Sequence, residues 1–156
     1  MKKIILTVAA VFAFGVANAQ DGAFKLGAHV GIPMGDIKDA SSLNYGLDAA
    51  YVWSVADKFK AGVTTGYDVF SGKDGIDDIT FLPVAATGQY SFSDKIFGGL
   101  DLGYAVGISD NNDGGLLYQP KVGYQAEKFE VALGYKGIAV DGITVSAVTL
   151  GFNYKF

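Results

Sequence analysis

Apolar and polar residues alternate at every second position along most of the chain. Between residues 59 and 69, the odd positions are mostly apolar or aromatic, and the even positions are Lys, Gly, Thr, Gly and Asp. A period of two is typical of a β-strand whose two faces meet different surroundings. On this basis the sequence predicts eight strands, at residues 23–33, 43–53, 59–70, 79–92, 96–108, 116–126, 129–140 and 143–156.

Short and long connections alternate between these strands along the chain. Residues 54–58, 93–95 and 127–128 are short, and each contains an acidic residue followed by Lys. Residues 34–42, 71–78 and 109–115 are longer and rich in Gly, Asp and Ser, and Asp141-Gly142 is a tight last turn. This order predicts an all-β fold, an eight-stranded antiparallel up-and-down barrel. Its strands of 11 to 14 residues are long enough to cross a membrane.

Alternation alone leaves open which face is outside, because a soluble lipocalin-like barrel has an apolar interior and a membrane barrel an apolar exterior. The charged residues within the predicted strands all share the less apolar parity. A charge that faces lipid near the midplane costs about 2–4 kcal/mol, so the charge-free parity is expected to face lipid. We therefore predict a charge network that pairs inside the lumen and fills it. Its members are Lys25, Asp48, Lys60, Asp68, Asp101, Lys121, Glu130, Lys136 and Lys155.

Glycine and aromatic positions favour the same arrangement. Eleven glycines share the charged parity, which suits the narrow interior of an eight-stranded barrel: Gly27, Gly31, Gly46, Gly62, Gly66, Gly99, Gly103, Gly107, Gly123, Gly134 and Gly151. Aromatic residues gather toward both ends of the predicted strands, with Phe97 at the short connections and Phe70 and Phe81 at the long ones. We interpret these residues as two belts at the membrane–water interfaces.

The first nineteen residues predict a secretory signal peptide. Lys2 and Lys3 give a positive start, residues 4–16 form an apolar run, and Ala17-Asn18-Ala19 is a cleavage site of the A-x-A type. Thirteen apolar residues are too few to span about 30 Å of hydrocarbon as a retained helix. We therefore expect a signal peptide at 1–19 and one barrel domain at 20–156.

Composition excludes several classes of protein. The chain has no Cys, which excludes a disulfide scaffold and a thiolate metal site. Its net charge of −4 argues against a nucleic-acid partner. His29 is the one histidine and is predicted to face the lumen, without a second His or Cys to share a metal. We expect no cofactor, no metal and no catalytic residue.

The long connections carry the excess of negative charge. They hold Asp36, Asp39, Asp74, Asp77, Asp78, Asp110, Asp113 and Asp141 against Lys38 and Lys73, a balance of 2 − 8 = −6. We interpret them as solvated loops. The alternative is weak binding of a divalent cation, for which residues 109–115 supply oxygen atoms. That segment lacks the 12-residue loop and closing Glu of a calcium site, and it fits a turn equally well.

The signal peptide, the barrel pattern and the ending Leu-Gly-Phe-Asn-Tyr-Lys-Phe at 150–156 together resemble the small eight-stranded outer-membrane barrels of the OmpA and OmpX kind. The chain resembles in particular the short outer-membrane β-barrel domain proteins of Bacteroidetes. The resemblance covers the whole mature chain. It implies that Phe152, Tyr154 and Phe156 form the signal recognised by the barrel-assembly machinery.

The resemblance also implies a place in the outer membrane of a Gram-negative bacterium, with membrane lipid as a partner. The resemblance is to a broad family and does not imply an activity. We expect a structural or surface-interaction role, in which a rigid barrel presents its acidic loops, and no enzymatic activity. Two other functions stay open: a narrow channel for small or apolar solutes, as in OmpW-like proteins, and a membrane enzyme that acts on lipid. A soluble periplasmic barrel is the alternative at the level of the fold.

Overall fold

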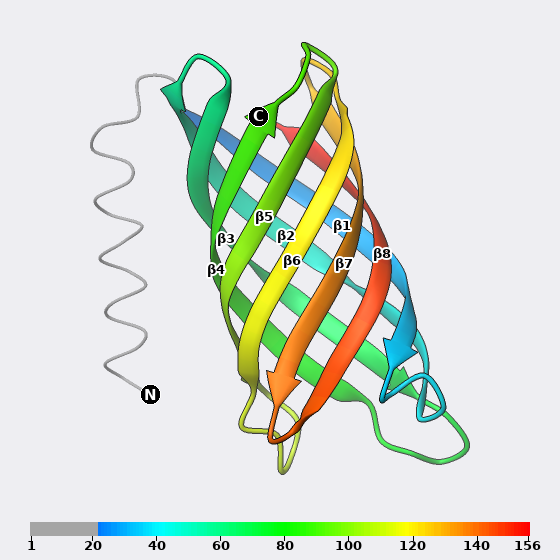
Figure 1. The fold of residues 1–156 in the computed structure, drawn as a ribbon. Helices are drawn as coiled ribbons and strands as arrows, with labels where there is room; N and C mark the ends of the chain where they lie inside the picture. The colour runs from blue at the N-terminus through cyan, green and yellow to red at the C-terminus, as the bar shows by residue number, and fades with distance from the viewer. Residues whose placement is uncertain (1–21) are drawn as a thin grey trace.

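The computed structural model describes residues 22–156, which form a closed antiparallel barrel of eight strands (Figure 1). The strands are β1 (Gly22–Gly35), β2 (Ser41–Ala56), β3 (Phe59–Gly72), β4 (Ile79–Ser91), β5 (Ile96–Gly107), β6 (Gly115–Gln125), β7 (Phe129–Val140) and β8 (Ile143–Lys155). Each strand pairs with the next, and β8 closes the barrel on β1. The predicted fold class is confirmed, and no strand end departs from its predicted position by more than three residues.

The predicted signal peptide at 1–19 lies outside the described residues. Within residues 22–156, no helix is long and apolar enough to cross a bilayer.

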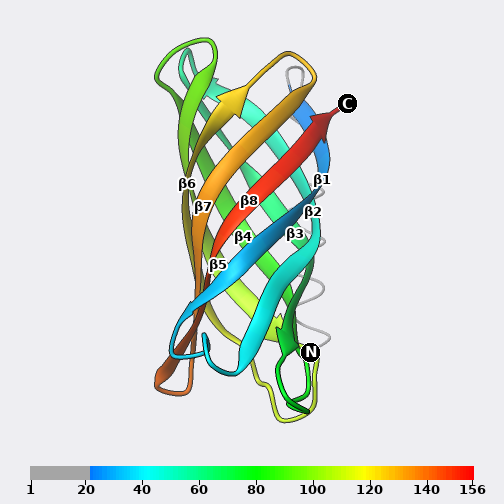
Figure 2. The same cartoon turned by 90° about the vertical axis from the view of Figure 1, so that its right-hand side faces the viewer.

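Short turns and longer loops lie at opposite ends of the barrel (Figures 1 and 2). Residues 57–58, 92–95 and 126–128 form the turn end, and residues 36–40, 73–78, 108–114 and 141–142 form the loop end. The last loop contains two residues of positive φ, Asp141 at 41° and Gly142 at 88°. Such a pair matches the right-handed twist of the flanking strands, which explains the Asp-Gly sequence there.

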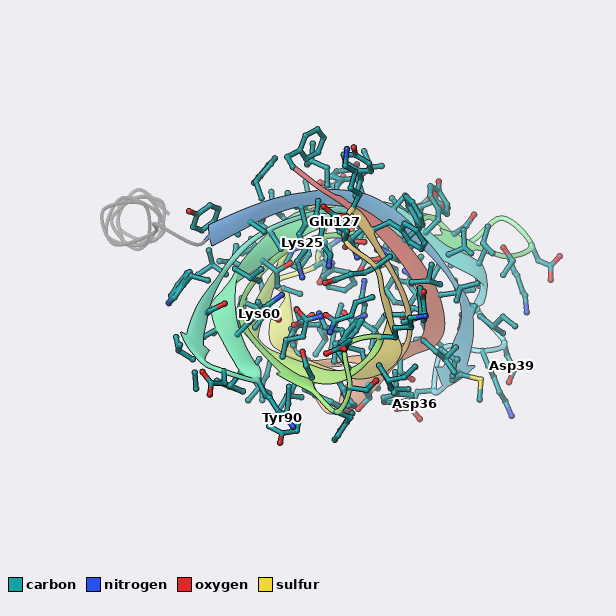
Figure 3. The ribbon with its side chains drawn as sticks, turned by 90° about the horizontal axis from the view of Figure 1, so that it is seen from above. Lys25, Asp36, Asp39, Lys60, Tyr90 and Glu127 are labelled. Atoms are coloured by element: carbon teal, nitrogen blue, oxygen red, sulfur yellow. The ribbon has the colours of Figure 1, made fainter. Side chains whose placement is uncertain are left out.

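The apolar face of the barrel is its exterior. Leu102, Leu133 and Leu150 are about half exposed, whereas Lys25 and Glu130 are buried in the lumen. Viewed along the axis from the turn end, Lys25 points inward and Tyr90 points outward (Figure 3). The arrangement is that of a membrane barrel, because a soluble barrel would bury its apolar face.

A lysine placed midway along the exterior tests this assignment. We expect Leu102→Lys to lower the free energy of unfolding in phospholipid vesicles by about 2–4 kcal/mol, because a charge at the midplane loses its hydration. Ile96→Lys, on the same face of β5 but at the turn end, should cost about 0–1 kcal/mol. Equal and small losses in urea unfolding would contradict a lipid-facing exterior.

The aromatic belt at the turn end differs from the prediction at one position. The exterior rings there pack against one another, as in Phe24–Phe156, Tyr51–Trp53, Tyr90–Phe92, Tyr124–Phe129, Phe129–Phe152 and Tyr154–Phe156. Phe97 is 1% exposed and faces the lumen, because it shares the parity of Asp101 on β5. At the loop end, Phe70 and Phe81 likewise face the lumen and are fully buried.

Glycines on the exterior lie beneath aromatic rings. The ring of Phe59 lies over Gly88, and the ring of Phe92 lies over Gly98. Tyr51 over Gly22 and Tyr118 over Gly137 repeat this arrangement. An exterior glycine leaves backbone uncovered, and a neighbouring ring restores the apolar cover. Several aromatic residues of the exterior therefore protect backbone as well as meeting the lipid interface.

Two prolines interrupt the strand ladders. The β3–β4 pairing skips from Thr65↔Val84 to Asp68↔Phe81, across Pro83. The β6–β7 pairing has a similar gap, from Tyr118↔Gly137 to Lys121↔Gly134, across Pro120. Proline has no backbone N–H, so each of the two prolines removes one hydrogen bond from the ladder. In a closed barrel neither proline can occupy an edge, and both strands keep their pairing on the other side.

Candidate functional site: the lumen and the loop surface

Apolar side chains fill the loop-end half of the lumen. They form a buried cluster, here called the apolar plug, of Ile37, Phe70, Phe81, Ala85, Ala105, Leu117, Ile138, Val145 and Ala147. The rings of Phe70 and Phe81 meet edge to face, with centroids 6.1 Å apart. Ile37 reaches the plug from the loop at 36–40 and is 4% exposed. The plug contains no charged group.

A buried polar cluster lies next to the plug, around the carboxylate of Asp68. Lys136 Nζ donates to Asp68 Oδ2 at 2.6 Å, and Asn44 Nδ2 donates to Asp68 Oδ1, also at 2.6 Å. His29 Nε2 lies 3.2 Å from Asp68 Oδ1, and His29 Nδ1 lies 2.7 Å from Asp48 Oδ2. The Asp68 and Lys136 side chains are 1% and 2% exposed. At such burial an ion pair needs this many partners to offset its lost hydration.

A second set of ion pairs lies toward the turn end. Lys25 Nζ lies 2.8 Å from Glu130 Oε2 and donates to Gln89 Oε1 at 2.9 Å. Lys155 Nζ lies 3.3 Å from Glu130 Oε1 and donates to the carbonyl oxygen of Ala126 at 2.7 Å. One carboxylate is thus shared by two lysines from β1 and β8. Both lysines point into the lumen, where they narrow it at the turn end.

Three charges of the predicted network remain. Lys121 and Asp101 form an ion pair, and Lys60 lies outside the ion pairs of residues 22–156. Lys121 Nζ lies 2.7 Å from Asp101 Oδ2, and this pair is less buried, since the Lys121 side chain is 21% exposed. Lys60 forms no ion pair within residues 22–156 and lines a hollow at the turn-end mouth with Asp94 and Gln125. Eight of the nine predicted lumen charges therefore lie in three groups of contacts.

The space that these side chains leave is small. A cavity of about 70 Å³ lies between the polar groups, lined among others by Lys25, His29, Asp101 and Lys136. A buried water needs about 10–15 Å³ of such volume and two to four polar partners. The cavity has room for a few waters and is far smaller than the pocket of a typical organic ligand.

His29 is held by acidic and basic groups and not by a hydroxyl. Its contacts are Asp48, Asp68 and Lys136, whose Nζ lies 3.0 Å from Nε2. A histidine that activates a nucleophile lies within hydrogen-bond reach of that nucleophile. Here the ring lies on β1 and contacts charged groups from β2, β3 and β7. Within residues 22–156 no group of three or more His, Cys, Asp or Glu residues could hold a metal ion.

The residues of the expected assembly signal lie on the exterior at the turn end. Phe152, Tyr154 and Phe156 are 50%, 40% and 72% exposed. The ring of Phe156 lies 5.0 Å from that of Tyr154, and its backbone N–H donates to the carbonyl oxygen of Phe24 at 2.9 Å. These residues continue the aromatic belt across the junction of β8 with β1.

The eight aspartates of the loops are all exposed. Two of them bind backbone: Asp36 Oδ2 accepts from Thr144 N at 3.0 Å, and Asp78 Oδ1 accepts from Gly72 N at 2.9 Å. In the segment at 109–115, Asn112 Oδ1 accepts from Gly114 N at 3.0 Å, and Asn111 has a φ of 59°. These features are those of an Asn/Gly turn.

The apolar plug is the feature that the sequence reasoning missed. A signal was present, because the charged parity becomes apolar toward the loop end of strands β3 to β8, as at Phe70, Leu117 and Ile138. The change is along the barrel axis, so the total charge of a whole strand does not reveal it.

No family model and no curated protein matches the sequence. Solved structures of similar fold exist at low identity. The attachment invasion locus protein Ail of Yersinia pestis is 15% identical, with a TM-score of 0.61, over 86% of this chain and 97% of that one. A de novo designed transmembrane β-barrel is 14% identical, with a TM-score of 0.56, over 86% and 95%. The N-terminal barrel of Pseudomonas aeruginosa OprF is 12% identical, with a TM-score of 0.53, over 86% and 97%. The fold of this chain is therefore that of the small eight-stranded outer-membrane β-barrels.

Proposed function

We propose that this chain is a bacterial outer-membrane barrel with a closed lumen, which acts as a structural or surface-interaction protein through its acidic loops. The observation that carries the proposal is the filled lumen, where the apolar plug and the buried ion pairs leave a cavity of about 70 Å³. The apolar exterior and its aromatic belt suit a bilayer, with short turns toward the periplasm and loops outside. The predicted signal peptide and the expected assembly signal at Phe152, Tyr154 and Phe156 suit export to the outer membrane.

The charge of the loops limits the partners that we propose. One of the similar structures is Ail in complex with the heparin analogue sucrose octasulfate. The loops of the present chain hold eight Asp and two Lys, so their field repels a polyanion. We propose that its partners outside the cell are neutral or cationic.

The contacts within the lumen support this role over the other functions considered. A narrow channel for apolar solutes requires a path through or around the buried rings of Phe70 and Phe81. A lipid-acting enzyme requires a nucleophile in contact with its base, and both ring nitrogens of His29 contact other charged groups. The proposed role requires neither a path through the lumen nor a nucleophile in contact with a base.

We expect the folded barrel to show no steady conductance of the open-porin kind in a planar lipid bilayer. The physical reason is the apolar plug, which contains no charged group, together with the small volume of about 70 Å³ that the lumen side chains leave. The recording is made beside an open porin at equal protein amounts. Long-lived conductance steps of porin size from the purified barrel would contradict a closed lumen and favour the channel.

We expect Ile76→Cys, in the loop at 73–78, to react on intact cells with a thiol reagent that does not cross membranes. The chain has no native Cys, and Ile76 is 51% exposed, so the label reports one position. Asp94→Cys, in a turn at the other end, should react only after lysis. Labelling of Asp94→Cys alone would reverse the orientation, and recovery of both variants in the soluble fraction would refute the membrane location.

A further inference from the structure

A pocket remains at the loop-end mouth of the barrel, above the apolar plug. Its volume is about 620 Å³, within the range of about 300–1,000 Å³ that is common for ligand sites. Three chain segments line it: residues 77–81, residues 108–112 and residues 140–145. These segments join β3 to β4, β5 to β6 and β7 to β8 (Figure 2). The pocket is named here the loop-end pocket.

The floor of the loop-end pocket is apolar. Phe81 and Val145, both members of the plug, lie at its base. Ile108 and Ile143 line it as well and are 50% and 48% exposed. An exposed apolar surface inside a hollow is typical of a binding site, because covering it removes apolar area from water.

The rim of the pocket is acidic. Asp77, Asp78 and Asp110 line it and are exposed. None of them forms an ion pair with another residue of the stretch 22–156. Of the two loop lysines, Lys73 donates to the carbonyl oxygen of Lys38 at 2.8 Å. The carboxylates at the rim are therefore available to a cation from outside.

Hydrogen bonds hold one wall of the pocket in place. Ile108 N donates to the carbonyl oxygen of Thr80 at 2.9 Å, and Asn112 Nδ2 donates to the same oxygen at 3.3 Å. Thr80 N donates to Ser109 Oγ at 3.3 Å. The segment at 108–112 is thereby fixed to the start of β4. A wall that is ordered before binding reduces the entropy lost when a ligand binds.

We propose that the loop-end pocket binds a peptide segment in which a Lys or Arg adjoins aliphatic or aromatic side chains. The apolar side chains of the peptide cover Ile108 and Ile143, and the cation meets Asp77 and Asp110 at the rim. The inference deepens the proposed surface-interaction role and rests on it. A bare divalent cation suits the pocket poorly, because the floor offers it no oxygen ligands.

The test uses the whole mature barrel in nanodiscs of a zwitterionic phospholipid, so that lipid charge does not attract the probe. The probe is the peptide acetyl-Lys-Leu-Trp-Leu-Lys-amide, and its binding is followed by calorimetry and Trp fluorescence. We expect saturable binding with a stoichiometry near one. Two control peptides, with Glu in place of Lys or with Ser in place of the apolar residues, should each bind at least about tenfold more weakly.

Matched variants place the binding site. Asp77→Asn with Asp110→Asn should weaken binding about tenfold, whereas Asp39→Asn with Asp74→Asn, which removes the same charge elsewhere, should change it less than twofold. Ile143→Ser should weaken binding several-fold, and Ile76→Ser, at a similarly exposed residue outside the pocket, should not. Asp78 is left intact because it accepts from Gly72 N.

Equal losses in the two aspartate pairs would overturn the inference, because they would indicate attraction by net charge alone. Equal binding of the peptide with Ser would overturn it too, since the floor would then contribute nothing. No binding of the probe to a barrel whose loops label on intact cells would refute the pocket while leaving the proposed function in place. Open-porin conductance would refute the proposed function instead.

Discussion

Asp68→Asn is expected to lower the free energy of unfolding by about 3–5 kcal/mol. The Asp68 carboxylate accepts hydrogen bonds from Lys136 and Asn44, and it is fully buried. Asparagine keeps the shape of the side chain and removes its charge. The ammonium of Lys136 then stays buried beside a neutral partner, and the lost Coulomb attraction no longer offsets its desolvation. Urea unfolding in phospholipid vesicles, with heat-modifiable gel migration as a second readout, measures the change.

Two comparisons separate this effect from a general loss of packing. The variant Asp68→Asn with Lys136→Met should lose less than the sum of the two single losses, because no buried charge remains unpaired. Asp101→Asn should lower the free energy of unfolding less than Asp68→Asn. The partner of Asp101 is Lys121, whose side chain is 21% exposed, whereas the partner of Asp68 is Lys136, whose side chain is 2% exposed. Additive losses in the first comparison, or equal losses in the second, would contradict the importance of burial at Asp68.

Phe70→Ala is expected to lower the free energy of unfolding by about 3–5 kcal/mol as well. Phe70 is fully buried in the apolar plug, where its ring meets Phe81 edge to face with centroids 6.1 Å apart. Truncation removes the buried ring and leaves a cavity that the closed barrel cannot collapse around, since its diameter is fixed by the strand number and stagger. The same urea titration reports the loss.

Tyr67→Ala, on the same strand, is the matched control. Tyr67 faces outward and is 49% exposed, so its truncation leaves no cavity and should cost clearly less. Bilayer recording of Phe70→Ala adds an independent readout, because we expect brief conductance events absent from the unaltered barrel. If Tyr67→Ala were as destabilising as Phe70→Ala, the plug would not be a tightly packed core.

The fold was predictable because successive residues of a barrel strand face the exterior and the lumen in turn. The different surroundings of the two faces therefore produce a pattern of period two in the sequence. The strand that contains Phe59 and Phe70, for example, has to present apolar groups to one side and small or charged groups to the other. The turn chemistry was local too, since Asp141-Gly142 needs only its own backbone preferences. Parity therefore identified the lumen face, on which Lys25, Glu130 and Lys136 all lie.

The alternation of residues along each strand does not predict which lumen charges pair with one another. Lys136 and Asp68 are separated by 68 residues, and Lys25 and Glu130 by 105. Which carboxylate meets which lysine depends on strand tilt and on the stagger at closure, quantities that belong to the whole barrel. Lys60 illustrates the limit, because it shares the parity of the network but lies at the turn-end mouth.

The sequence by itself determined the number of strands, the lumen face, the ends of the barrel and the acidic loop surface, because each follows from periods and turns along one segment. Only the tertiary structure decided that the lumen divides into an apolar plug and buried ion pairs, and that Asp77, Asp110 and Ile143 line one pocket. These features depend on side chains from distant strands meeting across the barrel. Their distances are set by closure of β8 on β1 and not by any stretch of sequence.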